Sequence, residues 1–235
     1  HREYPIANYD YVICNGTYWK KPYSEAFSVS EDQVIVTGMP RLDHLLDEGF
    51  VRVSREKLFA RHPEWKGKKL LLYAPTFRGN IYEGMKQVPI DLHRLMKQLG
   101  SGYALLYKLH PLLKHEALSD DRRIYNMNDA DLHELFCVAD VLISDFSSII
   151  FDFSLLNKPI CYYVPDLDQY MEERGCFVDY AELTEGRLAS DEDGLAALIR
   201  SEDDGNSAMA MHPYMEHRDG HNLDRVLKLI DAILK

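Results

Sequence analysis

Hydroxyl, cationic and carboxylate side chains gather at a few points of the sequence, most of them directly after short apolar runs. Arginine and hydroxyl groups donate hydrogen bonds to phosphate oxygens, so this composition indicates an anion site. Serines that open a helix would add to it, because a helix N-terminus presents unpaired N–H groups and a partial positive charge. The candidate residues after the apolar runs are Gly38, Arg41, Thr76, Arg78, His110, Asp145, Ser147 and Ser148.

Each of these residues has a second interpretation. Asp145 or Ser147 could simply cap a helix, and because like charges repel, Asp145 is better suited to capping or to orienting a hydrogen-bond donor than to touching phosphate. His110 either bonds to the backbone at a strand end or stabilises charge on a leaving phosphate. Arg78 either holds a phosphate through two nitrogens or lies on the surface after a turn.

The end of the sequence holds a further group. Asp219 could cap a helix that runs to Ile233, and Gly220 would let the backbone approach a ligand closely. Both would then join the candidate binding site.

The apolar runs themselves are expected to be strands. Leu70–Ala74 and Val141–Ile143 are apolar throughout, which is typical of strands buried on both faces of a parallel sheet. With helices between them, they predict a doubly wound, mostly parallel, Rossmann-like α/β fold, whose ligands bind beyond the carboxyl ends of the strands. An antiparallel α+β domain would show more alternating strands. The expected strands are 9–15, 33–37, 69–74, 103–109, 122–127, 140–144 and 160–164, and the clearest helices 91–99, 129–139 and 147–156.

Composition excludes several classes of protein. The 235 residues are 46% apolar and carry a net charge of −11, which argues against a disordered chain and against general attraction to nucleic acid. No apolar run approaches the roughly 18 residues of a membrane span. The four cysteines lack CxxC spacing, and Cys137 and Cys161 lie in apolar runs, as reduced core cysteines would. The histidines show no metal-ligand spacing, and we expect no metal and no cofactor.

Two charged stretches are expected to be solvated helices with flanking loops. Residues 181–205 are acidic, whereas residues 52–69 hold seven Lys or Arg against two Glu. The basic stretch could also contact membrane headgroups or an anionic polymer.

Five motifs in order resemble the CDP-glycerol glycerophosphotransferases, the polymerases and primases of wall teichoic acid. None is specific singly, but together they extend from residue 37 to residue 220. The motifs are Thr37–Asp43, Tyr73–Arg78, His110-Pro111, Ile143–Ser148 and Asp219-Gly220.

The resemblance implies a glycosyltransferase-B architecture, of which residues 1–235 would be the C-terminal, donor-binding domain. The chain begins at His1 with neither an initiator methionine nor a signal peptide, as expected for part of a longer protein whose N-terminal acceptor domain lies elsewhere. The family's second histidine, the expected catalytic base in a Trp-His-Gly-Thr-type motif, has no counterpart here. We therefore expect this chain alone to bind the nucleotide and to depend on its N-terminal partner for activity.

The resemblance also implies roles for the candidate residues. Arg78, His110, Ser147 and Ser148 would contact the pyrophosphate of the CDP-activated substrate, with His110 catalytic and Asp145 and Asp219 in support. Thr76, Gly38, Arg41 and Gly220 complete the expected substrate-binding set.

The implied reaction transfers glycerol phosphate or ribitol phosphate from a CDP-activated substrate to a hydroxyl of a lipid-linked polyol-phosphate or glycan acceptor and releases CMP. Its expected place is the cytoplasmic face of the cell membrane, with peripheral contact and no nucleic acid. Two alternatives stay open: a glycosyltransferase-B enzyme that uses a nucleotide sugar, and a non-catalytic nucleotide-binding module.

Overall fold

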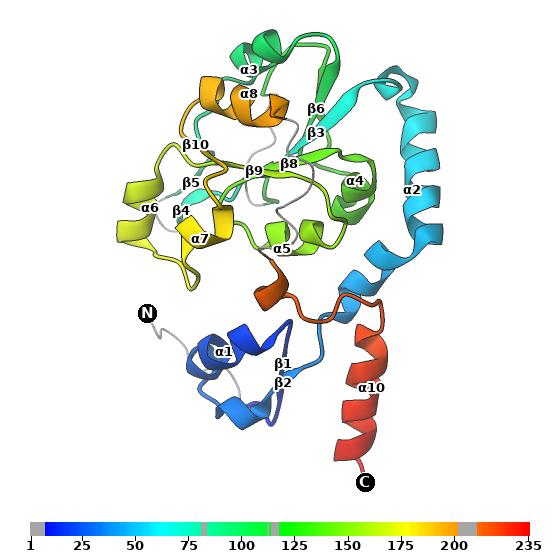
Figure 1. Cartoon of the computed structure of the whole chain (residues 1–235), viewed down its shortest axis with the longest axis vertical. Helices are drawn as coiled ribbons and strands as arrows, with labels where there is room; N and C mark the ends of the chain where they lie inside the picture. Colours follow the sequence, from blue (N-terminus) through cyan, green and yellow to red (C-terminus); the bar gives the residue numbers. More distant parts are fainter. Residues whose placement is uncertain (1–7, 81–83, 112, 114–117, 202–210) are drawn as a thin grey trace. The chain divides into compact units, whose positions relative to one another are not determined.

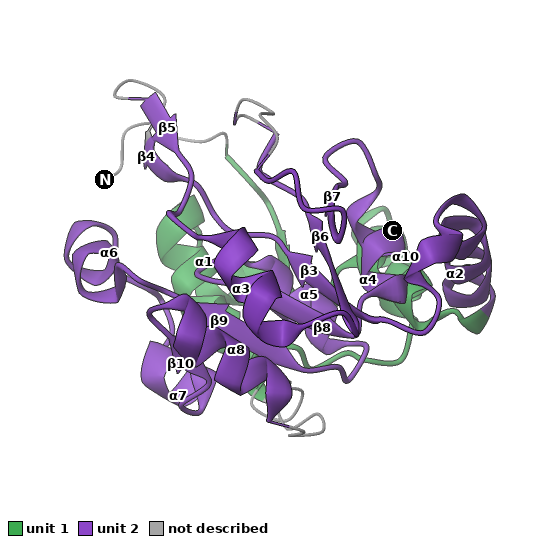
Figure 2. Ribbon diagram, turned by 90° about the horizontal axis from the view of Figure 1, so that it is seen from above, with its two compact units in different colours: residues 1–48, 211–235 green, residues 49–210 purple. Residues whose placement is uncertain are grey.

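The chain forms two compact units (Figure 2). The computed structural model describes residues 8–80, 84–111, 113, 118–201 and 211–235. The small unit comprises residues 1–48 and 211–235, and the large unit comprises residues 49–210. The predicted strands and their helices fall mostly in the large unit.

A six-stranded sheet forms the centre of the large unit, and all its strands are parallel. The central strand β3 pairs on one side with β6, Leu71 opposite Leu105, and on the other with β8, Leu71 opposite Val141. This confirms the predicted doubly wound, mostly parallel α/β fold. In sheet order the strands are β10 (Leu188–Ala189), β9 (Ile160–Tyr163), β8 (Val141–Ser144), β3 (Lys69–Tyr73), β6 (Tyr103–Tyr107) and β7 (Ile124–Asn126).

Helices cover both faces of this sheet (Figure 1). Because successive side chains of a strand point to opposite faces, Leu71 and Tyr73 join the core beneath α3 and α8, while Leu70 and Leu72 face the layer of α4 and α5. All four side chains are buried, as expected of uninterrupted apolar strands. The helices of the large unit are α2 (Glu48–Arg61, which begins at the unit boundary), α3 (Leu92–Leu99), α4 (Leu132–Val138), α5 (Ile149–Ser154), α6 (Leu167–Glu173), α7 (Tyr180–Thr184) and α8 (Glu192–Arg200).

The small unit is built on two parallel strands, β1 (Val12–Cys14) and β2 (Val34–Val36), joined through α1 (Lys20–Phe27). The last part of the chain packs against its beginning: the Trp19 indole N–H donates to Tyr214 O at 2.9 Å. Helix α10 (Asn222–Ile233) completes the unit.

All seven predicted strands are confirmed, as β1, β2, β3, β6, β7, β8 and β9, within a few residues at each end. The three clearest predicted helices are α3, α4 and α5, and the predicted helix to Ile233 is α10. The sequence did not predict the two-residue β10, the helices α6 and α7, or the hairpin of β4 (Arg78–Asn80) and β5 (Gly84–Lys86).

The charged stretches form helices over most of their described residues, but they are not purely solvated; residues 202–205 of the acidic stretch lie outside the described residues. Acidic α8 buries Leu195 and Ile199 in the core. In basic α2, Arg55 donates to Cys137 O at 2.8 Å and Lys57 pairs with Glu134, so part of its charge is used to attach it to α4. Its predicted membrane contact stays a prediction.

Cys137 and Cys161 are buried and unbonded to other cysteines, as predicted. Across the residues that the structure describes, no helix has the length and apolar character to cross a membrane.

Candidate functional site

The order of the strands reverses between β3 and β8. From β3 the chain continues to β6 and β7 on one side of the sheet, and it then returns to β8 on the other side. Such a switch point opens a crevice beyond the carboxyl ends of the two strands, where ligands of doubly wound folds bind. Thr76 and Arg78 follow β3, and Asp145, Ser147 and Ser148 follow β8. Five predicted site residues therefore lie at the switch point.

Asp145 links the two loops at this point. Its carboxylate is fully buried and accepts hydrogen bonds from Thr76 N and from Arg78 Nη1, both at 2.8 Å. A further bond, from Ser144 Oγ to Ala74 O at 2.7 Å, ties the same strand ends together. Of the alternatives for Asp145, the structure supports orientation of a hydrogen-bond donor, namely Arg78, and not a helix cap.

Arg78 is held by a second carboxylate from the loop after β9. Its Nε donates to Asp166 Oδ2 at 2.6 Å and its Nη2 to Asp166 Oδ1 at 3.0 Å, a two-pronged pair. Its Nη1 also donates to Thr76 O at 3.0 Å. These contacts leave a single N–H, on Nη2, for any further partner among the described residues. The predicted phosphate contact of Arg78 stays a prediction.

Aromatic rings surround the same guanidinium. Phe146 and Tyr170 stack with ring centroids 3.6 Å apart and an interplanar angle of 6°. The Arg78 Cζ lies 5.3 Å from the Phe146 centroid and 5.0 Å from that of Tyr170, within the range of cation–π attraction. Tyr170 belongs to α6, so ring contacts and the ion pair attach α6 to the loops after β3 and β8.

The group formed by Arg78, Asp145, Asp166 and the backbone of Thr76, which we name the Arg78 clamp, has one cation against two carboxylates. Burial lowers the pKa of Arg78, but the hydrogen bonds to the two carboxylates outweigh it and raise the pKa above its ordinary value. The bonds from Arg78 lower the pKa of Asp166. Burial raises the pKa of Asp145, whereas Arg78 and Thr76 act in the opposite sense.

Two hydroxyl groups stand beside the clamp at the start of α5. Ser148 is exposed and makes no capping bond through its side chain, and Ser147 Oγ lies 3.5 Å from Ile149 N, at the limit of a hydrogen bond. The Thr76 Oγ1 is buried and has no hydrogen-bond partner among the described residues. The Ser147 and Ser148 hydroxyls can donate to a ligand, whereas the Thr76 oxygen is covered in this structure.

His110 reaches the site through the loop after β6. Its ring lies against Phe77, with centroids 4.8 Å apart, and Phe77 stands between Thr76 and Arg78. The loop after β6 is bonded to the loop after β7, because Lys108 Nζ donates to Asn128 O and to Ala130 O, at 2.7 Å each. The structure thus brings His110 to the same loop as Arg78.

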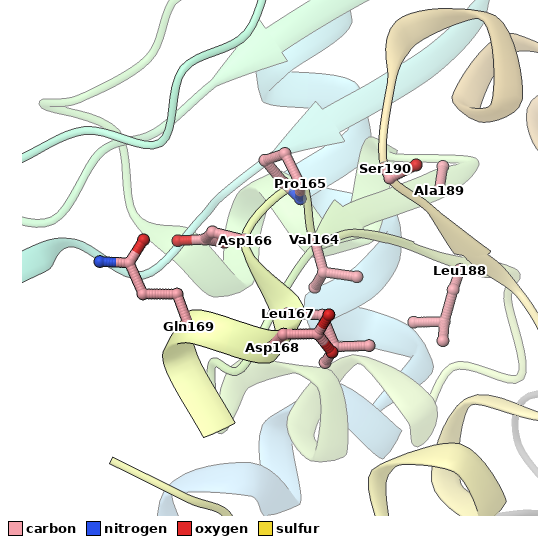
Figure 3. A pocket seen from close by; sticks show the side chains of 9 residues that line it. All are labelled: Val164, Pro165, Asp166, Leu167, Asp168, Gln169, Leu188, Ala189 and Ser190. Carbon is pink, nitrogen blue, oxygen red and sulfur yellow. The ribbon is translucent and has the colours of Figure 1, made fainter. Parts of the chain in front are cut away.

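A cavity of about 490 Å³ opens beyond the ends of β9 and β10 (Figure 3). Asp166 forms part of its wall, but its side chain points away from Leu188 and Ser190. The cavity therefore adjoins the clamp through the first turn of α6.

The remaining predicted residues, Gly38, Arg41, Asp219 and Gly220, belong to the small unit. Gly38 has a φ of +73°, and a Cβ there would meet Asn222 Oδ1 at 2.0 Å, so only glycine fits. Gly220 also has a positive φ, +74°. The part of these residues in substrate binding stays a prediction.

The prediction that Asp219 caps the C-terminal helix is wrong. Asp43 accepts the N–H groups of Asn222 and Leu223 at 3.1 and 2.8 Å and thereby caps α10 from a distant turn. Asp219 instead pairs with Arg225, with one oxygen 3.0 Å from Nη1.

Sequence reasoning missed Asp166 and Tyr170. Asp166 was within reach of the same argument that found the other residues, because it follows the predicted strand 160–164 directly after Pro165. Tyr170 had no such signal, since its contact with Phe146 depends on how α6 folds back. In the part of the chain that the structure describes, no group of three His, Cys, Asp or Glu is placed to hold a metal ion.

Several known proteins are similar to this chain in sequence and in fold. The teichoic acid ribitol-phosphate primase of Bacillus spizizenii is 33% identical over 97% of this chain, and the teichoic acid glycerol-phosphate primase of Bacillus subtilis is 29% identical over 97%. A solved structure of a histidine-to-asparagine variant of the wall teichoic acid polymerase TagF, soaked with CDPG, superposes with a TM-score of 0.80 at 27% identity over 95% of the chain.

The chain spans 60% and 59% of the lengths of the two primases and 58% of the TagF chain. A sequence model of the family described as CDP-Glycerol:Poly(glycerophosphate) glycerophosphotransferase matches residues 1–232. The chain therefore belongs to the CDP-glycerol:poly(glycerophosphate) glycerophosphotransferase family.

Proposed function

We propose that this chain binds the CDP-activated substrate of an enzyme that transfers glycerol phosphate or ribitol phosphate to a growing cell-wall polymer or capsule. The acceptor is a hydroxyl of a lipid-linked polyol phosphate or glycan, and CMP is released. The chain would form the C-terminal half of a glycosyltransferase-B architecture. The N-terminal acceptor domain and the catalytic base would come from the rest of a longer protein.

The observation that carries this proposal is the convergence at the switch point. The Ser147 and Ser148 hydroxyls follow β8 there, and His110, from the loop after β6, contacts Phe77 in the loop after β3. A pyrophosphate needs several hydrogen-bond donors from different directions, and these loops supply donors at the carboxyl ends of neighbouring strands.

The reaction makes one P–O bond and breaks another. The acceptor oxygen attacks the phosphorus that bears the polyol, the bond from that phosphorus to the bridging oxygen breaks, and CMP leaves with the electron pair. The acceptor proton passes to the base. Negative charge spreads over the phosphate oxygens in the transition state, so catalysis consists mainly of positioning and electrostatic stabilisation.

The proposal gives His110 the part of assisting the leaving CMP. In this proposal its ring, set against Phe77, donates a hydrogen bond to the phosphate on which charge accumulates. The hydroxyls hold the other phosphate oxygens. A lipid-linked acceptor would bring the enzyme to the cytoplasmic face of the membrane, where basic α2 is a candidate for peripheral contact.

Calorimetric titration tests the proposal. The chain is expected to bind CDP-glycerol or CDP-ribitol more tightly than CMP or a UDP-sugar. His110→Ala should weaken CDP-polyol binding about tenfold, the loss expected for one hydrogen bond to a charged group. His93→Ala is the matched control, because His93 is an exposed histidine on α3 and should leave the affinity unchanged.

Other outcomes would point elsewhere. Tighter binding of the UDP-sugar would favour an enzyme that uses a nucleotide sugar. Folded protein that binds no nucleotide would contradict the proposal and favour an interaction module.

A further inference from the structure

The Arg78 clamp joins three loops that are far apart in the sequence. The loop after β3 contributes Thr76 and Arg78, the loop after β8 contributes Asp145, and the loop after β9 contributes Asp166. The Arg78–Asp166 pair spans 88 residues of sequence. The loop after β8 also carries the two serines of the proposed phosphate site.

Charge and exposure argue against a phosphate at the guanidinium. The side chains of Arg78 and Asp145 are 15% and 0% exposed. Asp166 takes the Nε–Nη2 edge of Arg78, and Asp145 and Thr76 O take both hydrogens of Nη1. A phosphate at the same nitrogens would stand beside two carboxylates, and like charges repel strongly where water is scarce. The single remaining N–H does not offer the two parallel bonds by which arginine usually recognises phosphate.

We propose that Arg78 and Asp166 are positioning residues: together they hold the loops after β3, β8 and β9 so that the serine hydroxyls meet the phosphates of the CDP-activated substrate. This inference rests on the proposed function and assigns Arg78 a different part from the direct phosphate contact implied by the family resemblance. Tyr170 supports the same arrangement, because its stack on Phe146 attaches α6 to the loop that carries the serines.

The α6 helix is fastened at a second point. Arg174, which follows the helix, donates from Nη2 to Gly79 O, and its guanidinium lies 5.7 Å from the Phe77 ring centroid. Two arginines therefore connect the same two segments. Arg78, after β3, bonds to Asp166 at the start of α6, and Arg174, at the end of α6, bonds back to Gly79 O. A segment fastened at both ends can position its neighbours.

Asp166→Asn is the decisive variant because two accounts predict opposite signs. If Asp166 positions Arg78, the variant weakens binding of CDP-glycerol and of inorganic pyrophosphate about tenfold. If Asp166 instead competes with phosphate for Arg78, the same variant tightens binding. Asp168→Asn is the matched control, an identical change two residues along at an exposed side chain, and it should leave both affinities unchanged.

Three further measurements separate positioning from loss of folding. The melting temperature of Asp166→Asn should stay within about 3 °C of the wild type, and Asp166→Glu, which keeps the carboxylate, should recover part of the affinity. The Asp166→Asn, Arg78→Lys double variant should bind no more weakly than the weaker single variant, because both changes open one contact.

The outcomes distinguish this inference from the proposed function. Wild-type protein that fails to bind CDP-glycerol overturns the proposed function. Wild-type protein that binds it, with Asp166→Asn binding equally well or better, overturns only the positioning role. A large drop in melting temperature without recovery in Asp166→Glu would also overturn it, since Asp166 would then merely stabilise the fold.

Discussion

The two units of the chain each contain an arginine paired with an aspartate, but in opposite surroundings. In the large unit, Arg78 lies between Asp145 and Asp166, and the Asp145 side chain is fully buried. In the small unit, Arg225 pairs with Asp219, whose side chain is 51% exposed. Arg78 holds Asp166, and Arg225 holds Asp219, through two parallel bonds, but Arg78 also has a second, buried carboxylate partner in Asp145.

This difference distinguishes the Arg78 pairs, which link loops of the candidate site, from the Arg225–Asp219 pair, which lies at the surface. Water screens the exposed pair, and such pairs contribute little to stability. A buried pair contributes little net stability as well, but removal of one partner strands the other as an unpaired charge. The large unit therefore depends on Arg78 in a way that the small unit does not depend on Arg225.

The largest expected effect is that of Arg78→Ala. The substitution leaves the buried Asp145 without its cation, and we expect the free energy of unfolding to fall by about 3–5 kcal/mol. Urea denaturation measures the change. Arg225→Ala is the comparison in the small unit, and a loss there as large as that of Arg78→Ala would remove the distinction between the two pairs.

The stability of the small unit depends instead on the close packing of Gly38 against Asn222. Gly38→Ala should lower the free energy of unfolding by about 2–4 kcal/mol, the sum of a strained positive φ and an overpacked contact at 2.0 Å. Gly67→Ala is the matched control, with a similar φ of +77° and no heavy atom within 4 Å of its Cβ position. Equal losses in the two variants would show that strain alone matters at Gly38.

The smallest effect is expected for Asp219→Asn. Hydrogen bonds from Arg225 lower the pKa of Asp219 to about 2, below the value of about 3.9 in an unfolded chain. The pair thus contributes stability that is fully present above about pH 4 and lost as the pH falls toward 2. At pH 7 the variant should lose at most about 1 kcal/mol, because the side chain is half exposed.

Urea denaturation of wild type and Asp219→Asn at neutral pH and near pH 2 checks this sign. The difference between them should shrink as the pH falls. A difference that grows instead would mean that Asp219 is not stabilised as a carboxylate in the folded protein.

The strands of the large unit were predictable because their apolar runs are short and unbroken. Lys69–Tyr73 and Val141–Ser144 are almost entirely buried, and runs of four to five residues are too short for a typical helix. The β4–β5 hairpin and the two-residue β10 carry no such run, so only their partners in the fold define them.

The site was predictable where residues follow strands directly and unpredictable where contacts join distant segments. Arg78 and Asp145 were predicted because each closely follows a strand. The bond between them, and the bond of Arg78 to Asp166, depend on which strands are neighbours in the sheet. The cap of α10 shows the same limit: Asp219 stands three residues before the helix, yet Asp43, 179 residues from Asn222, accepts its first N–H. The spacing of residues in the sequence cannot identify a hydrogen-bond partner that only the tertiary structure brings close.

Binding of a CDP-activated substrate at the switch point of the large unit can be followed through the amide chemical shifts of the ¹⁵N-labelled chain during titration with CDP-glycerol. We expect saturable shifts concentrated at Thr76, Phe77, His110 and the segment 145–149, and much smaller shifts with a UDP-sugar. Saturable shifts confined to residues remote from these loops would contradict binding at this switch point.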